Sequence, residues 1–195
     1  MQLSGMLWGS KILKFVDFPS AEVLGPNATD DQIRDLIKRW GSILIKPIFK
    51  GAVGKKGKAG LIGKASDLKT ALAEKERLYF AKHLHGSTVV KAEGVTFEGM
   101  VPAEHEVYVS ISDNTRFRAP TLTLSHRGGV AIEEVPRDQV IAVPFDALTG
   151  LKGFVVSNEL NQLKAPKAII SPLVQHVPKL WDLFHSFGMT TLELN

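Results

Sequence analysis

One apolar segment places the strongest constraint on what this chain can fold into. From Ser42 to Phe49 the sequence is nearly all apolar until Lys46. A run of this kind is typical of a strand that is buried on both faces of a sheet. The sequence therefore predicts a layered structure in which an inner strand carries a single lysine close to its end.

A loop rich in glycine and lysine follows this strand within ten residues. Residues 54–60 read Gly-Lys-Lys-Gly-Lys-Ala-Gly. The backbone N–H groups and ammonium groups of such a loop can surround an anion. Polyphosphate is the obvious candidate, because it has several charges and many acceptor oxygens. A solvent-exposed basic hairpin tip has the same composition, so the loop alone leaves both interpretations open.

Length and composition exclude several classes of protein. The chain has 195 residues, enough for one large domain or two small lobes, and its 44% hydrophobic and 23% charged residues are ordinary for a globular protein. The net charge of +4 favours anionic ligands but is too small to identify a nucleic-acid binder. With no cysteine, the chain has no disulfide, no thiolate zinc site and no cysteine nucleophile. We expect a cytoplasmic protein without a membrane segment or signal peptide.

The order of predicted elements indicates an α+β fold. Strands and helices are mixed without the strict strand–helix–strand alternation of a parallel sheet. Capping residues and turns mark most of the boundaries. The predicted elements are a helix from the capping box at Thr29 to Trp40, ended by Gly41; a helix capped by Ser66 and running to about Lys82; strands over 106–112, 120–125 and 139–144; a turn-rich stretch over 145–165; and a helix opened by Pro166 that Pro172 and Pro178 kink or divide.

Six short segments, in order from about Ile43 to the last residue, carry a family pattern. They are Leu44-Ile45-Lys46, Lys56-Gly57-Lys58-Ala59-Gly60, Glu104-His105-Glu106-Val107-Tyr108-Val109, Gly128-Gly129-Val130-Ala131-Ile132-Glu133, Phe145-Asp146-Ala147-Leu148-Thr149-Gly150 and Leu192-Glu193-Leu194-Asn195. Together they resemble the ATP-grasp half of the succinyl-CoA synthetase β subunit and the equivalent region of ATP citrate lyase. The resemblance implies an ATP-grasp fold over residues 1–195, with two lobes whose mixed or antiparallel sheets are flanked by helices. The expected lobes are residues 20–97 and 98–195, after a leading segment 1–19.

The resemblance also assigns roles to individual residues. Lys46 is expected to contact the phosphates of ATP or GTP, and Lys55, Lys56 and Gly57 to form a mobile flap over the triphosphate. Glu98 and the backbone around Val101 are expected to meet the adenine at the hinge between the lobes. The remaining expected contacts are Glu106, with the ribose hydroxyls, and Asn195, a Mg²⁺ ligand. Each chemistry is sound, because lysine suits phosphate, a carboxylate accepts two hydrogen bonds from a diol, and an amide oxygen suits a hard cation.

The implied activity is phosphoryl transfer in an NDP-forming acyl-CoA synthetase or an ATP citrate lyase-like enzyme. The γ-phosphoryl group would pass to a histidine on a partner α-type chain and then to a carboxylate, and CoA would capture the acyl phosphate. The family continues beyond Asn195 with a second magnesium carboxylate and a ligase domain. The chain is therefore expected to be the nucleotide-binding part of a split or multi-chain enzyme, or a truncated piece of a longer chain. It is expected to be inactive alone, with CoA bound through the partner or the absent domain.

The residues leave other interpretations open. The flap has Lys55-Lys56 where the family has glycine and arginine, so the residue alignment over 50–57 is open. Lys46 also fits a surface strand end, and Glu98 and Glu106 also fit salt bridges or solvated carboxylates. Gly128-Gly129 is either a functional loop or a turn that needs positive φ. A basic, non-catalytic nucleic-acid-binding domain and a regulatory grasp-fold subunit without turnover are the alternative functions, although no nucleic-acid partner is expected.

Overall fold

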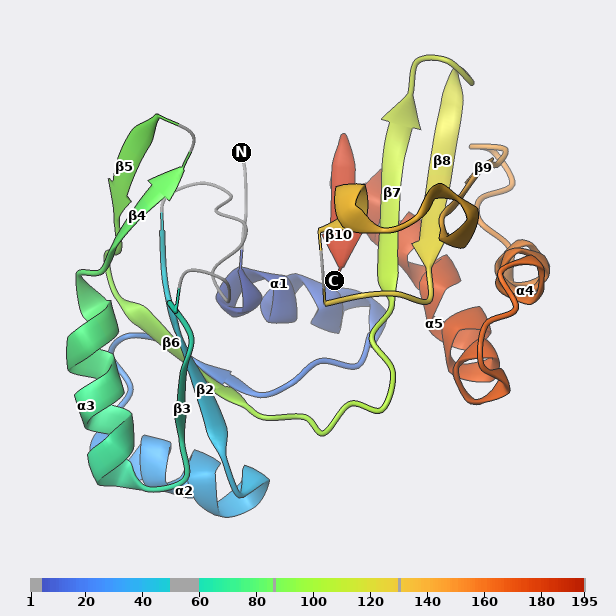
Figure 1. The fold of residues 1–195 in the computed structure, drawn as a ribbon. Coiled ribbons are helices and arrows are strands. Elements are labelled where there is room, and N and C mark those ends of the chain that lie inside the picture. The colour runs from blue at the N-terminus through green and yellow to red at the C-terminus, as the bar shows by residue number, and fades with distance from the viewer. Residues whose placement is uncertain (1–4, 50–59, 86, 130, 195) are drawn as a thin grey trace. The chain divides into compact units, whose positions relative to one another are not determined.

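The computed structural model describes residues 5–49, 60–85, 87–129 and 131–194, and the chain divides into two compact units (Figure 1). The first unit comprises Met1–Lys14 and Pro19–Pro102. The second comprises Phe15–Phe18 and Ala103–Asn195. Each unit has its own sheet and its own helices.

The first unit is built on a four-stranded antiparallel sheet. Its strands are β1 (Val23–Leu24), β6 (Val95–Gly99), β2 (Ile43–Pro47) and β3 (Gly63–Ala65), in that spatial order. The register of β2 with β6 sets Ile45 opposite Phe97 and Lys46 opposite Thr96. Since successive side chains alternate between faces, this register sends the isoleucines of β2 to one face and Lys46 to the other.

Two helices cover the isoleucine face of this sheet. Helix α2 (Asp30–Trp40) starts at a capping box, in which the Thr29 hydroxyl accepts from the Gln32 N–H and the Gln32 side chain accepts from the Thr29 N–H. It ends at Gly41, as predicted. Helix α3 (Leu68–Tyr79) follows β3. The core between helices and sheet consists mainly of fully buried side chains: Ile33, Leu36, Ile43, Ile45, Ala71, Leu78, Val95 and Phe97.

The remaining elements of the first unit are short. Helix α1 (Met6–Leu13) contacts β1 and β6. The 3₁₀ turn over Lys14–Val16 that follows it leaves the first unit, since Phe15–Phe18 belong to the second. The hairpin β4 (Lys82–His85) and β5 (Thr88–Lys91) forms a separate two-stranded sheet before the chain enters β6. None of the helices in the described ranges is both long enough and apolar enough to cross a membrane.

The second unit has an antiparallel sheet with one pair of helices against it. Its spatial order is β10 (Thr191–Leu194), β7 (Tyr108–Asn114), β8 (Ala119–Ser125) and β9 (Ile141–Pro144). Helix α5 (Lys167–Ser186) contacts β7 and β10, and α4 (Gly153–Gln162) contacts α5 and β8. Two 3₁₀ turns, Ile132–Glu134 and Arg137–Gln139, lie between β8 and β9. The Trp181 ring packs edge-on against Phe145 with centroids 5.0 Å apart.

Four predictions about local structure need correction. The stretch 145–165 was predicted to be turn-rich, but it contains α4, which packs along α5. Asp67 rather than Ser66 caps α3, and the helix ends at Tyr79 rather than near Lys82. Strand β2 is fully buried on one face only, because Leu44 and Lys46 on the other face are half-buried.

The sequence left open whether Pro172 and Pro178 kink one helix or divide it into two. Helix α5 is a single helix that includes both prolines. Its N-cap is Pro166, as the sequence predicts.

The cap of α3 leads to a testable pH dependence. The backbone N–H of Thr70, and then its hydroxyl, donate to the Asp67 carboxylate and lower its pKa below the ordinary value of 3.8. Because the folded-state pKa is depressed, this stabilisation is present above pH 3.8 and is lost as the pH falls through the folded pKa. We expect Asp67→Asn to unfold at lower urea than wild type at pH 7, and the difference to shrink at pH 3. Ser66→Ala, the control, is expected to unfold like wild type at both values.

Candidate functional site

Lys46 and Glu98 form an ion pair on neighbouring strands of the first unit. Lys46 Nζ lies 2.6 Å from Glu98 Oε2. The register sets Leu44 opposite Glu98 and Lys46 opposite Thr96, so the two charged residues are diagonal neighbours on one face. This face is opposite the one that packs against α2 and α3. The sheet thus brings together two predicted site residues that are far apart in sequence.

Burial differs between the two partners. The Glu98 side chain is 5% exposed and that of Lys46 is 28% exposed. A buried carboxylate needs charged or hydrogen-bonding partners to offset its lost hydration. The side chain of Lys46, in contrast, is partly exposed, so a ligand from outside the sheet can approach it.

Thr96 completes this group, and sequence reasoning missed it. Its hydroxyl lies 2.9 Å from Glu98 Oε1 as donor and 3.4 Å from the backbone oxygen of Lys46. Residues two apart on a strand share a face, and this signal points from Glu98 to Thr96. Both carboxylate oxygens of Glu98 are therefore engaged, one by an ammonium and one by a hydroxyl. The Glu98 side chain thus forms a salt bridge, one of the arrangements that the sequence left open.

Val101 lies just after β6 in an irregular segment. The N–H of its neighbour Met100 donates to the Ser42 oxygen at 3.1 Å, which ends the pairing of this region with the start of β2. The Val101 side chain is 52% exposed. Among the residues that the structure describes, none is hydrogen-bonded to the Val101 backbone, so its N–H and C=O are available to a ligand.

Glu106 belongs to the second unit, where it contacts the double-glycine loop. The Gly128 N–H donates to the Glu106 carbonyl oxygen at 2.8 Å. Gly129 has φ +72°, and a Cβ atom built there would collide with Glu106 Oε2. The turn therefore needs glycine at position 129 for its backbone conformation, and the missing side chain also leaves room for the carboxylate. Glu106 is exposed to solvent, as a ligand contact requires.

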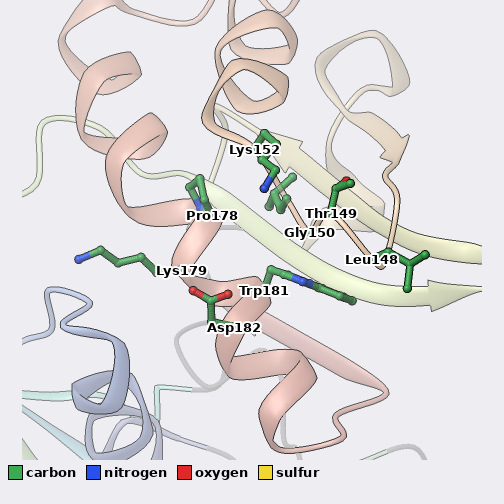
Figure 2. A pocket seen from close by; sticks show the side chains of 9 residues that line it. Leu148, Thr149, Gly150, Lys152, Pro178, Lys179, Trp181 and Asp182 are labelled. Carbon is green, nitrogen blue, oxygen red and sulfur yellow. The ribbon is translucent and has the colours of Figure 1, made fainter.

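The Asp146 turn forms the rim of a hollow on the second unit. The Asp146 carboxylate accepts from the N–H groups of Thr149 and Leu148, each at 2.8 Å, and these bonds lower its pKa. The hollow has a volume of about 350 Å³ and lies between residues 148–152 and α5 (Figure 2). None of its described lining residues is a predicted nucleotide contact.

Four predicted site residues lie outside the described part of the chain. They are Lys55, Lys56 and Gly57 of the expected flap and Asn195, the expected magnesium ligand. Within the described ranges, no group of three or more histidine, aspartate or glutamate side chains is placed to hold a metal ion.

Comparison with known proteins finds a family match that extends over most of the chain. A family model described as an ATP-grasp domain matches residues 27–195. The β subunit of ADP-forming succinate–CoA ligase from Desulfurococcus amylolyticus is 32% identical over 158 residues, which are 80% of this chain and 40% of the relative. The chain spans about two fifths of the length of the curated relatives it matches.

Solved structures with the same fold include two CoA-dependent enzymes. ATP citrate lyase of Methanothrix soehngenii, in complex with citrate and coenzyme A, has a TM-score of 0.67 and 19% identity, over 90% of this chain and 40% of that one. Acetyl-coenzyme A synthetase 1 of Ca. Korarchaeum cryptofilum, with coenzyme A, acetyl-coenzyme A and a phosphorylated phosphohistidine segment, has a TM-score of 0.64 and 13% identity. It covers 95% of this chain and 82% of that one. At these identities the likeness establishes the fold.

Gly129→Ala tests the double-glycine loop, with Gly188→Ala as a matched control. Both glycines have positive φ, +72° and +56°, but a Cβ at Gly188 meets nothing within 4 Å. We expect each substitution to lower the free energy of unfolding by about 1 kcal/mol, the cost of a left-handed residue with a side chain. The Glu106 carboxylate is the end of a flexible side chain and can swing away in Gly129→Ala. Urea denaturation checks this, and a loss several times larger in Gly129→Ala would mean that Glu106 cannot move.

Proposed function

This chain belongs to the ATP-grasp domain family, and on that premise we propose that it is the nucleotide-binding part of an NDP-forming acyl-CoA synthetase or an ATP citrate lyase-like enzyme. The observation that carries the proposal is the partly exposed side chain of Lys46, held on the face of the sheet opposite the α2–α3 core. A compact ammonium of this kind suits a phosphate oxygen. The family match over residues 27–195 is the reason for taking the phosphate ligand to be a nucleotide.

We assign the nucleotide contacts residue by residue. Lys46 would contact the phosphates, and Lys55, Lys56 and Gly57 would cover them. The strand end from Glu98 to Val101 would meet the adenine, with the Val101 backbone as its free hydrogen-bonding group. Glu106 would accept from the ribose hydroxyls. The described residues fit this assignment, because Lys46, Val101 and Glu106 all reach solvent.

Magnesium would be held by Asn195 together with the phosphates. Mg²⁺ is commonly bound by one or two protein oxygens plus substrate phosphates and water. That chemistry needs no three-residue cluster and agrees with the described residues, which contain none. When bound, Mg²⁺ would offset the negative charge of the phosphate oxygens.

The reaction proposed for the whole enzyme is a sequence of phosphoryl transfers. The γ-phosphoryl group of ATP would move to a histidine nitrogen of a partner α-type chain, and ADP would leave. A carboxylate would then take the phosphoryl group from that histidine, and the CoA thiol would displace phosphate from the acyl phosphate. The phosphohistidine segment of the Ca. Korarchaeum cryptofilum enzyme, which has this fold, supports the first step. This chain would bind and orient the nucleotide, which is the main requirement of such transfers.

We place the CoA and acid sites outside this domain, in the partner or in further regions of the enzyme, and we expect the domain to be inactive alone. A cytoplasmic location also stays a prediction. The assigned contacts are compatible with either ATP or GTP as the nucleotide.

Lys46→Ala tests the proposal directly. Titration calorimetry of Mg·ATP into wild type is expected to give saturable 1:1 binding, and into Lys46→Ala no measurable binding, because the phosphates lose their ammonium partner. Lys38→Ala is the control, since it removes the same charge from α2, on the opposite side of the sheet. Unchanged affinity in Lys46→Ala would refute the site. Salt-sensitive binding of polyuridine RNA without nucleotide binding would favour the nucleic-acid alternative.

Gly129→Ala provides a second test, at the ribose end. A methyl group at this position occupies the space of the Glu106 carboxylate, so the carboxylate must move. We expect Mg·ATP affinity to fall about tenfold, the value of a hydrogen bond to a charged group. Gly188→Ala is expected to bind like wild type. Equal affinity in the two variants would remove Glu106 from the site.

A further inference from the structure

The side chain of Lys46 needs a fixed position if it is to select phosphate. Lysine carries its charge on a flexible four-carbon stem, and holding that stem in one conformation costs rotamer entropy. This entropy cost reduces the free energy of ligand binding unless contacts within the protein already hold the lysine in place. The contacts of Lys46 within the first unit indicate what holds it.

We infer that Glu98 and Thr96 are positioning residues, which hold Lys46 for the phosphates rather than contact the base through their side chains. This inference rests on the proposed function and deepens it. The carboxylate of Glu98 accepts from Lys46 Nζ at 2.6 Å through one oxygen and from the Thr96 hydroxyl at 2.9 Å through the other. The second bond fixes the plane of the carboxylate, and the first then fixes the ammonium.

The surroundings of this group leave it little freedom. Glu98 and Thr96 are 4% and 5% exposed, so water cannot easily replace either partner. Glu98 lies on an inner strand that is paired with β1 at Val23 and with β2 at Leu44. The backbone positions of Lys46 and Thr96 are directly opposite in the ladder. The three side chains are thus anchored on two adjacent strands whose register is set by the core.

A carboxylate engaged in this way is poorly suited to recognise adenine. To bond the base, the buried Glu98 carboxylate would have to turn away from Thr96 or Lys46. The buried Thr96 hydroxyl would then lose its partner, or Lys46 would lose the group that holds it. In protein kinases, a glutamate does not contact the base but forms an ion pair with the lysine that contacts the ATP phosphates. The ion pair between Glu98 and Lys46 corresponds to that arrangement. The base is then left to the backbone beyond β6, around Val101.

The two roles of Glu98 predict different ligand dependence. A residue that acts through Lys46 affects every ligand with a polyphosphate, whether or not the ligand has a base. A residue that contacts adenine affects ATP only. Inorganic tripolyphosphate is therefore the discriminating probe, since it has phosphates and no base.

The experiment measures the dissociation constants of Mg·ATP, Mg·GTP and Mg·tripolyphosphate for wild type and three variants of the full chain. Glu98→Gln is expected to weaken all three ligands by the same factor, about tenfold, as one charge-assisted bond to Lys46 is lost. Thr96→Val removes only the hydroxyl from a buried position of the same shape, and a common factor of about threefold is expected. Thr96→Ser restores the hydroxyl and is expected to stay within about twofold of wild type.

The outcomes separate this inference from the proposed function. If wild type binds none of the three ligands, the proposed function fails and the inference fails with it. If wild type binds them but Glu98→Gln weakens ATP alone, Glu98 contacts the base and only the inference is overturned. It is also overturned if Thr96→Val binds tripolyphosphate as tightly as wild type does. Because valine has nearly the shape of threonine, Thr96→Val keeps the packing around position 96, and this test holds even if Glu98→Gln folds poorly.

Discussion

The pairing of β2 with β6 is the interaction on which the first unit and its candidate site both depend. β6 lies between β1 and β2, and its register decides which side chains share a face. Ile45 and Phe97 enter the core together, and Lys46 and Thr96 lie together on the other face. A slip of one residue would exchange the faces, placing Lys46 in the core and Ile45 outside it. The hydrophobic core therefore sets the position of the lysine before any ligand is present.

Charge within this sheet is balanced locally. A carboxylate as buried as that of Glu98 is tolerated only because an ammonium and a hydroxyl occupy its two oxygens. All three residues belong to the first unit, so that unit can form the group by itself. In the second unit, the Glu106 carboxylate occupies space that a side chain at position 129 would fill, and glycine leaves that space open. Each unit thus accommodates its own carboxylate through local geometry.

Helices whose ends carry capping residues were predicted well from the sequence. Helices whose position depends on packing against other elements were not. The capping box at Thr29 and the glycine at position 41 gave α2 its observed ends. Helix α4 was missed, because it lacks a side-chain cap and contains adjacent valines that favour strands, while its contacts are with α5 and β8. The prolines of α5 left two interpretations open, which the packing of one long helix against the sheet decided.

The sequence by itself determined that this chain has a grasp-like order of segments, a strand that delivers Lys46, and glutamates at positions 98 and 106. These features are local in the chain, so residue type and spacing reveal them. Only the tertiary structure decided that Glu98 partners Lys46, 52 residues away, and that Thr96 completes the group. Contacts between distant residues follow from strand register, and register is fixed by how the whole core packs rather than by any short stretch of sequence.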